Sequence, residues 1–152
     1  MSFTVSAQSR LSPEELVEEI LDVRNWPGFT GWGPLPGIDS ATIIEQTSSR
    51  VGTRIAVTNS DGSTHEESVT GYVPDRELVM KIENFSTPLK NFARYFVETW
   101  QFDRREGVTR IERTFELHAK GLIGQLILVP VGFLLRRAVA AHTKIIAAAG
   151  GH

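Results

Sequence analysis

The sequence contains no cysteine, and this absence excludes several kinds of chemistry. Disulfide bonds, thiolate nucleophiles and cysteine-ligated zinc sites all need a residue type that the chain lacks. The absence also fits a reducing compartment, because disulfides persist mainly in oxidising ones. We therefore expect a cytoplasmic location. Residues 1–10 are consistent with this expectation, since they show no basic start followed by the apolar run of a signal peptide.

The chain also lacks a strong charge of either sign. Its 16 basic and 18 acidic side chains are interspersed and give a net charge of −2, so nothing in the composition suggests a nucleic-acid partner. With 152 residues, 41% of them hydrophobic, the chain has the size of one ordinary globular domain. We expect residues 1–152 to form that single domain and to bury about 70% of the surface of the unfolded chain.

The longest apolar run is too short to cross a membrane. Residues 122–135 form a stretch of about 14 residues that includes Gln125 and Pro130, whereas a spanning helix needs about 20 apolar residues. We therefore predict no transmembrane segment and favour a buried helix. Three cations follow the run, namely Arg136, Arg137 and Lys144. They leave open an alternative in which this helix contacts a membrane surface.

The sequence is rich in alternation of apolar and polar residues, which begins with a predicted strand over residues 3–11. Ser12 then marks the start of a short helix, because it can act as the N-cap, with Pro13 in the first turn and Glu15 closing a capping box. A second short helical turn or loop is predicted to run to about Gly37. Further strands are predicted near residues 41–47, 52–59, 64–73, 77–85, 93–104 and 109–119.

Short turns connect several of these strands, so neighbouring strands are expected to be antiparallel. The last element is a helix from about residue 122 to 149, with a kink expected at Pro130 and an end at Gly150-Gly151. Because it is the only element large enough to cover the apolar face of the predicted sheet, we expect it to pack there and to leave a space between sheet and helix.

Three charged residues, Glu67, Glu98 and Arg113, stand in the apolar phase of the strands. Side chains alternate between the two faces of a strand, so all three are predicted to share the buried face. Buried charge is costly unless it is paired or solvated. A cavity beneath the sheet would explain their presence.

Several segments resemble START-like proteins of the polyketide cyclase/dehydrase type, in the SRPBCC superfamily. The segments are Trp26–Ile38, Val51-Gly-Thr-Arg54, Asp61-Gly62 followed by Glu66-Glu67, Glu98-Thr-Trp-Gln-Phe102 and Gly107-Val-Thr-Arg110. The resemblance covers nearly the whole chain. It implies an α+β helix-grip fold, in which a curved antiparallel sheet of about seven strands wraps around a long C-terminal helix. Two short helices would follow the first strand.

The resemblance also implies a deep cavity for a small hydrophobic or amphipathic organic molecule. Relatives of this kind include lipid and hormone binders, aromatic cyclases and stress-responsive proteins, and they share no catalytic signature. We therefore expect a binding protein without a cofactor. A polyketide cyclase or dehydratase that uses cavity Glu and Arg side chains is the alternative, and a homodimer is left open.

Hairpin counting from Glu106-Gly107 predicts that Glu98 lies directly opposite Arg113. The same count pairs Phe102 with Thr109, Trp100 with Ile111, and Phe96 with Phe115. One interpretation is a structural ion pair that fixes the register. The other is that Arg113 binds an anionic group of the ligand while Glu98 holds the guanidinium in place.

Glu67 is predicted to lie near Val57 and Asn84 on the inner face, away from the Glu98–Arg113 pair and without a partner. An unpaired carboxyl group in apolar surroundings exchanges protons nearer neutrality, as a general base for enolisation requires. The alternative is that Glu67 lies in water at the rim, near the turn at residues 60–62.

Among the histidines only His142 is predicted to face the sheet, because it shares a helical stripe with apolar residues. A satisfied core histidine and a ligand or base are both open interpretations. His65 lies by a turn, His118 in the outward phase and His152 at the terminus. They match no metal-ligand spacing, so we predict no metal site.

The aromatic residues Trp26, Phe29 and Trp32 cluster in one loop, either as core residues or at the mouth of the pocket. The side chains expected to line the cavity are those of Trp32, Ile55, Glu67, Val69, Met80, Asn84, Phe96, Glu98, Trp100, Arg113, Phe115, Leu135, Val139 and His142. The candidate catalytic residues are Glu67, Glu98, Arg113 and His142. If Glu67 and His142 face one open volume, an enzyme is favoured over simple binding.

Overall fold

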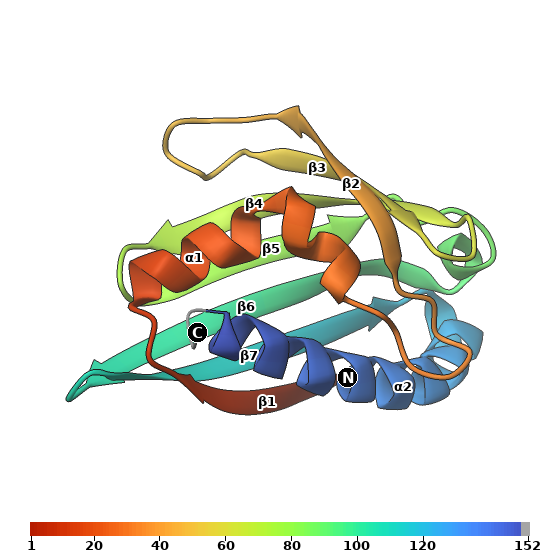
Figure 1. Ribbon diagram of the computed structural model, residues 1–152. Coiled ribbons are helices and arrows are strands. Elements are labelled where there is room, and N and C mark those ends of the chain that lie inside the picture. The colour runs from red at the N-terminus through yellow and green to blue at the C-terminus, as the bar shows by residue number, and fades with distance from the viewer. Residues whose placement is uncertain (150–152) are drawn as a thin grey trace.

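The computed structural model describes residues 1–149. They form one seven-stranded antiparallel sheet in the order β1-β7-β6-β5-β4-β3-β2 (Figure 1). The strands are β1 (Ser2–Ser9), β2 (Ile38–Glu45), β3 (Arg54–Asn59), β4 (Thr64–Val73), β5 (Glu77–Glu83), β6 (Ala93–Arg105) and β7 (Val108–Ala119). The helices are α1 (Pro13–Leu21), the 3-10 helices η1 (Val23–Gly28) and η2 (Leu89–Asn91), and α2 (Gly121–Ala148). The predicted helix end at Gly150-Gly151 and His152 lie outside the described residues.

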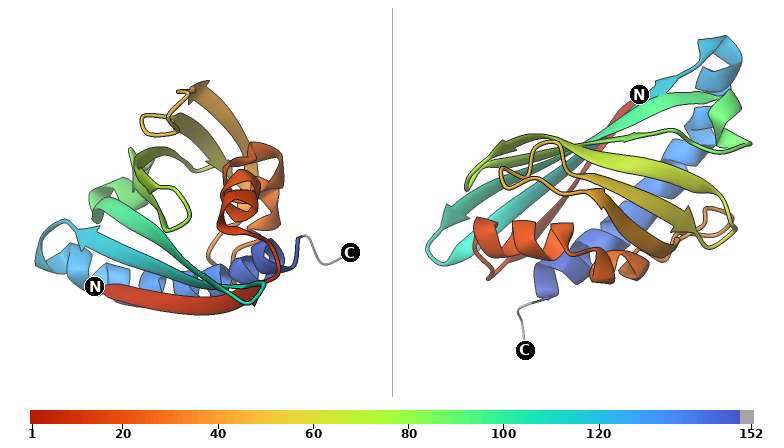
Figure 2. Two further views of the ribbon diagram at one scale, coloured as in Figure 1. Left: turned by 90° about the vertical axis from the view of Figure 1, so that its left-hand side faces the viewer. Right: turned by 90° about the horizontal axis from the view of Figure 1, so that it is seen from above.

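The sheet curves into an arc whose concave side holds the helices (Figure 2). Helix α2 lies along β1 and β7, while η1 packs against β2 at the other end of the arc. The expected helix-grip architecture is therefore confirmed. Helix α2 remains helical through Pro130.

Two groups of buried side chains fill the concave side. In the first, Leu16, Val17 and Ile20 of α1 pack with Ile55, Val69 and other inward residues of the sheet. In the second, Leu128, Leu135 and Val139 of α2 pack with Phe96, Phe115 and their neighbours. Helix α1 and the first part of α2 thus pack in different cores, while Ile146 near the end of α2 joins the core of α1.

Helix α1 begins as its sequence predicts. The Ser12 hydroxyl accepts a hydrogen bond from the backbone N–H of Glu15 at 3.2 Å, and the Glu15 carboxylate accepts one from the backbone N–H of Ser12 at 3.1 Å. Glu14, in the same turn, pairs with Arg50 at 2.7 Å and accepts a hydrogen bond from Tyr72 at 3.0 Å. These contacts tie the start of α1 to β4 and to the loop before β3.

The register of the β6–β7 hairpin differs from the predicted one by two residues. Glu106 and Gly107, both at positive φ, form the whole turn, so Arg105 pairs with Val108. Consequently Trp100 lies opposite Arg113 and Glu98 lies opposite Phe115. The other predicted pairs are shifted likewise, with Phe102 opposite Ile111 and Phe96 opposite Leu117. The prediction was wrong because its pairs did not leave Glu106 and Gly107 as the two unpaired residues of the turn.

The neighbours of Glu67 also differ from the prediction. Glu67 pairs with Ile55 on β3 and Ile82 on β5, not with Val57 and Asn84. Asn84 follows the end of β5 and has a φ of 58°. It is exposed, and its side chain donates a hydrogen bond to Glu66 on the outer face of the sheet. A register shift between Val69 and Gly71 also interrupts the alternation of β4.

Replacing Ser12 by alanine should lower the free energy of unfolding by about 1 kcal/mol, because the N-cap acceptor of α1 is lost. Urea denaturation measures this change. Ser12→Asp, which keeps an acceptor, and Ser49→Ala, which alters an exposed loop serine, should both stay close to the wild type. A full loss in Ser49→Ala as well would show that the effect is not one of capping.

Candidate functional site

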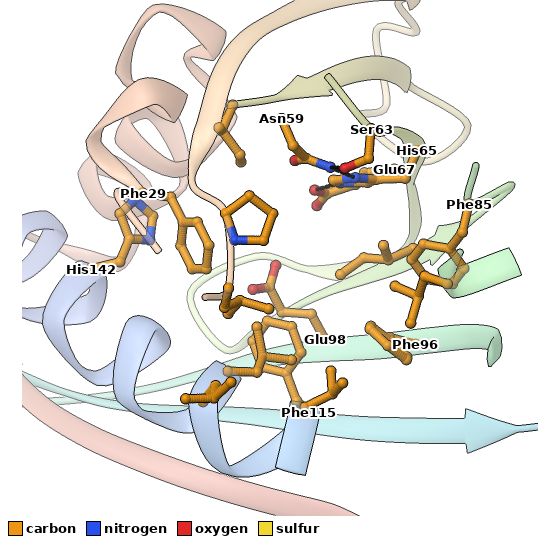
Figure 3. A pocket seen from close by; sticks show the side chains of 18 of the residues that line it. Phe29, Asn59, Ser63, His65, Glu67, Phe85, Phe96, Glu98, Phe115 and His142 are labelled. Atoms are coloured by element: carbon orange, nitrogen blue, oxygen red, sulfur yellow. Dashed lines mark hydrogen bonds and ion pairs between the residues drawn. The ribbon is translucent and has the colours of Figure 1, made fainter. Parts of the chain in front are cut away.

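A cavity of about 540 Å³ lies between the concave face of the sheet and α2 (Figure 3). Its wall is largely aromatic and aliphatic, and it borders both cores. The structure places these predicted residues in the wall: Glu67, Met80, Phe96, Glu98, Trp100, Arg113, Phe115, Leu135 and His142. Of the loop aromatics, Trp26 and Phe29 also line it.

The other predicted lining residues lie elsewhere. Ile55 and Val69 are packed against α1, and Val139 is enclosed in the core of α2, so none of these three borders the cavity. Trp32 is 46% exposed and lies on the surface. Asn84 is outside because β5 ends at Glu83.

A buried ion pair occupies one wall of the cavity. Arg113 donates from Nη2 and Nε to Oε2 of Glu98 at 2.6 and 2.8 Å, and both side chains are almost completely buried. The two residues are diagonal neighbours on β6 and β7, a spacing that long side chains bridge easily. The guanidinium also lies 4.2 Å from the centre of the Trp100 ring. The predicted pair is therefore present in spite of the shifted register.

Burial raises the pKa of the Glu98 carboxyl group, and the nearby Glu67 carboxylate raises it further, while the Arg113 guanidinium opposes both. The indole N–H of Trp100 also acts to lower this pKa, but it does not reach hydrogen-bond geometry. Trp100 Nε1 is the one fully buried side-chain polar atom without a hydrogen bond among residues 1–149. A buried donor of this kind is costly unless an acceptor meets it.

Arg113 also reaches the final helix. Its Nη1 donates to Nδ1 of His142 at 2.9 Å and to Oγ1 of Thr143 at 3.2 Å. Because Nδ1 accepts this bond, the imidazole is neutral and carries its proton on Nε2. Burial and the adjacent Arg113 charge lower the pKa of His142 from 6.5 to about 3. His142 thus lines the cavity as a neutral group with an N–H to offer.

The contacts of Arg113 with Glu98, His142 and Thr143 form a first polar cluster. A second polar cluster, on β3 and β4, consists of Asn59, His65 and Glu67. Nε2 of His65 is 2.9 Å from Oε2 of Glu67, and Nδ1 of His65 is 3.3 Å from the side-chain nitrogen of Asn59. An amide nitrogen can only donate, so Nδ1 accepts and Nε2–H donates to Glu67. The expectation that Glu67 has no partner was therefore wrong. His65 and Glu67 are two residues apart on one strand, which places both on the same face, and this spacing was the signal for the pair.

The two clusters face one volume. The carboxylates of Glu67 and Glu98 come from different strands and point toward the same space (Figure 3). The effect of Glu67 on the pKa of Glu98 shows that they are electrostatically close. His142 and His65 line the same cavity. Residues 1–149 contain no group of three or more His, Cys, Asp or Glu side chains arranged to hold a metal ion.

A curved sheet that holds one long helix over an apolar cavity defines the START-like, helix-grip class of proteins. Within this class, the chain belongs to the polyketide cyclase/dehydrase and lipid transport family, whose sequence profile matches residues 1–149. No protein of curated function matches the chain in sequence. Family and fold together indicate a ligand-binding domain, without a particular ligand or reaction.

Solved structures share the fold at low sequence identity. A truncated norcoclaurine synthase from Thalictrum flavum matches with a TM-score of 0.71 and 14% identity, over 97% of this chain and 91% of that one. A protein from Arthrobacter aurescens matches with a TM-score of 0.66 and 16% identity, over 97% and 84%. Ara h 8.0201 matches with a TM-score of 0.59 and 16% identity, over 96% and 97%. At these identities the likeness concerns the fold alone.

His142→Gln should make folding stability less sensitive to acid. The folded protein holds the pKa of His142 at about 3, below 6.5 in the unfolded chain, so its contribution is present above pH 6.5 and is lost as the pH falls toward 3. Between pH 7 and pH 5 the wild type should lose about 2 kcal/mol more unfolding free energy than the variant.

Urea denaturation at both pH values measures this difference. Glutamine keeps an acceptor for Arg113 and has no proton to gain, which makes it the suitable replacement. His118→Gln, at an exposed histidine on the outer face, should keep the wild-type dependence. Identical pH profiles for the wild type and His142→Gln would contradict a buried neutral imidazole.

Proposed function

We propose that the protein binds a small amphipathic organic molecule whose apolar body fills the cavity and whose polar group meets the two polar clusters. The observation that carries the proposal is a ligand-sized cavity of about 540 Å³ in which apolar walls surround two sets of buried polar side chains. Family membership supports binding of a small molecule.

The hydrogen-bonding groups in the wall favour a ligand that carries an acceptor. His142 lines the cavity, and its Nε2–H is a donor that no side chain among the described residues satisfies. The charge of Arg113 is already balanced by Glu98 at 2.6 Å. A carboxylate ligand would therefore meet Glu67 and Glu98 without a free cation, whereas a carbonyl or hydroxyl oxygen would accept a hydrogen bond from His142 Nε2–H.

A second candidate function is acid–base catalysis on the bound molecule. It is favoured by one observation, namely that Glu67, His65 and His142 line the same volume. In a cyclase or dehydratase reaction, the Glu67 carboxylate would remove a proton from the carbon next to a carbonyl group. The N–H of His142 would then donate to the resulting enolate oxygen. His65 would orient Glu67 through the 2.9 Å contact.

Leu134→Trp should weaken binding of a neutral apolar probe such as N-phenylnaphthylamine by about tenfold or more, because the larger side chain takes up part of the cavity that Leu134 lines. Fluorescence titration measures the dissociation constant. Val129→Trp adds the same ring on the same helix at a position that does not line the cavity, so it should bind like the wild type. Equal affinities in all three proteins would place the probe outside the cavity and contradict the proposal.

Glu67→Gln separates the two candidate functions once a ligand is identified. If the protein is an enzyme, turnover should fall by about a hundredfold or more while the ligand still binds, because the base is lost and the shape is kept. Glu66→Gln, on the outer face of the same strand, should leave turnover unchanged. If no turnover of a bound ligand is found in the wild type, the catalytic candidate is wrong and binding alone remains.

A further inference from the structure

The first half of α2 exposes a continuous apolar face. Leu122, Leu126, Val129 and Phe133 are 79%, 72%, 55% and 60% exposed, and their spacing places them along one line of the helix. Ile123 and Ile127, exposed to 70% and 39%, widen the line on one side. These six residues form the exposed apolar face of α2. The sequence-based expectation of a buried helix is therefore wrong for this face.

The orientation of α2 is fixed, so this face cannot turn inward. On the opposite side of the helix, a Cβ atom on Gly124 would lie 2.5 Å from the carbonyl oxygen of Phe92. A Cβ atom on Gly132 would lie 2.8 Å from the sulfur of Met1. At Gly124 the neighbour is backbone, so only glycine permits this approach of α2 to the segment before β6, whereas at Gly132 the neighbour is the flexible end of the Met1 side chain. Contiguous exposed apolar surface on a fixed element marks an interaction site.

Positive charge surrounds the face. No acidic residue occurs from Lys120 to Ala149, whereas Arg136, Arg137 and Lys144 continue its line toward the C-terminus. At the other end the Lys120 ammonium donates to the backbone carbonyl oxygen of Lys90 at 2.6 Å, which places this cation beside η2, and Lys90 is an exposed residue of η2. The first turns of α2 and η2 lie at the same end of the molecule (Figure 2).

An aromatic side chain from another element extends the face. The Arg137 guanidinium lies 5.1 Å from the centre of the Phe133 ring and 5.7 Å from that of Trp32. Trp32, which is 46% exposed, is thus brought beside the exposed apolar face of α2. A tryptophan next to an arginine at the border of an apolar surface suits the interface between water and lipid headgroups.

We propose that the protein docks peripherally on anionic lipid bilayers through the exposed apolar face of α2. The apolar side chains would enter the headgroup region, and the flanking lysines and arginines would meet lipid phosphates. A second copy of the chain is the poorer occupant, because two such helices would bring cations together without a carboxylate from either helix. The helix does not span the bilayer, because its other face packs on β1 and β7 and lines the cavity.

This docking surface goes beyond ligand binding but adjoins the cavity. Ile127 belongs to both, since it is 39% exposed and also lines the cavity, and Val131 and Leu134 line the cavity on the next turns. A docked protein would therefore hold the cavity wall against the bilayer. An apolar molecule could then pass between membrane and cavity along a short path that excludes water.

Sedimentation with vesicles tests the docking. The wild type should bind vesicles of phosphatidylcholine that contain about 30 mol% phosphatidylserine, and should bind pure phosphatidylcholine at least about tenfold more weakly. Leu126→Glu/Phe133→Glu should reduce binding to the anionic vesicles by about tenfold or more. The matched control is Ile44→Glu/Val73→Glu, which adds the same charge at positions 47% and 46% exposed on the sheet, and it should bind like the wild type.

Two further variants test the flanking charge and the cavity separately. Arg136→Gln/Arg137→Gln should weaken binding to anionic vesicles by about fivefold for each arginine removed, and Leu134→Trp should dock normally even if it no longer binds a cavity ligand. Absence of wild-type binding, or equal binding by the Leu126→Glu/Phe133→Glu variant, overturns the proposal. So does a wild type that is dimeric by light scattering and becomes monomeric in that variant, because a second copy would then cover the face.

Discussion

The bond between Glu98 and Arg113 is the constraint on which the interior depends. It joins β6 to β7, and through His142 and Thr143 it joins the sheet to α2. Because a charge in this position would be very costly alone, each partner requires the other, and removing one would cost about 3–5 kcal/mol. The same guanidinium keeps His142 neutral and oriented. One ion pair therefore links the final helix to the sheet, orients a cavity histidine that burial keeps neutral, and balances the charge in the cavity wall.

The sequence predicted the features that depend on local pattern. The N-cap at Ser12 follows from three neighbouring residues, and the inward direction of Glu98 and Arg113 follows from strand alternation. Their pairing was predicted from a wrong register, because diagonal and direct neighbours are both within reach of an arginine. The register itself depends on which residues take positive φ in the turn. Glutamate seldom takes positive φ, so the residue type of Glu106 does not predict its place in the turn.

Other features depend on contacts between distant segments. The partner of Glu67 was missed because His65 was considered only as a residue beside a turn, although its spacing from Glu67 within the predicted strand 64–73 places both side chains on one face. The exposed side of α2 could not be identified from its apolar pattern, since apolar residues occur all round its first turns. Gly124 and Gly132, eight residues apart on one side, are the local sign of where the backbone of α2 approaches its neighbours.

The open order of the sheet has a mechanical consequence. Strands β1 and β2 are the two edges of the sheet and do not pair with each other, so the sheet does not close into a barrel. Helices α1 and η1 lie on the open side (Figure 1). The β2–β3 ladder is also interrupted, between Ile38 and Ser40 and between Ile43 and Glu45. The β6–β7 hairpin, which carries the Glu98–Arg113 pair, has an uninterrupted register from Tyr95 to Arg105, in contrast to the β2–β3 arm. Local opening of the sheet is therefore expected to begin at the β2–β3 arm, where fewer consecutive backbone pairs hold the edge strand.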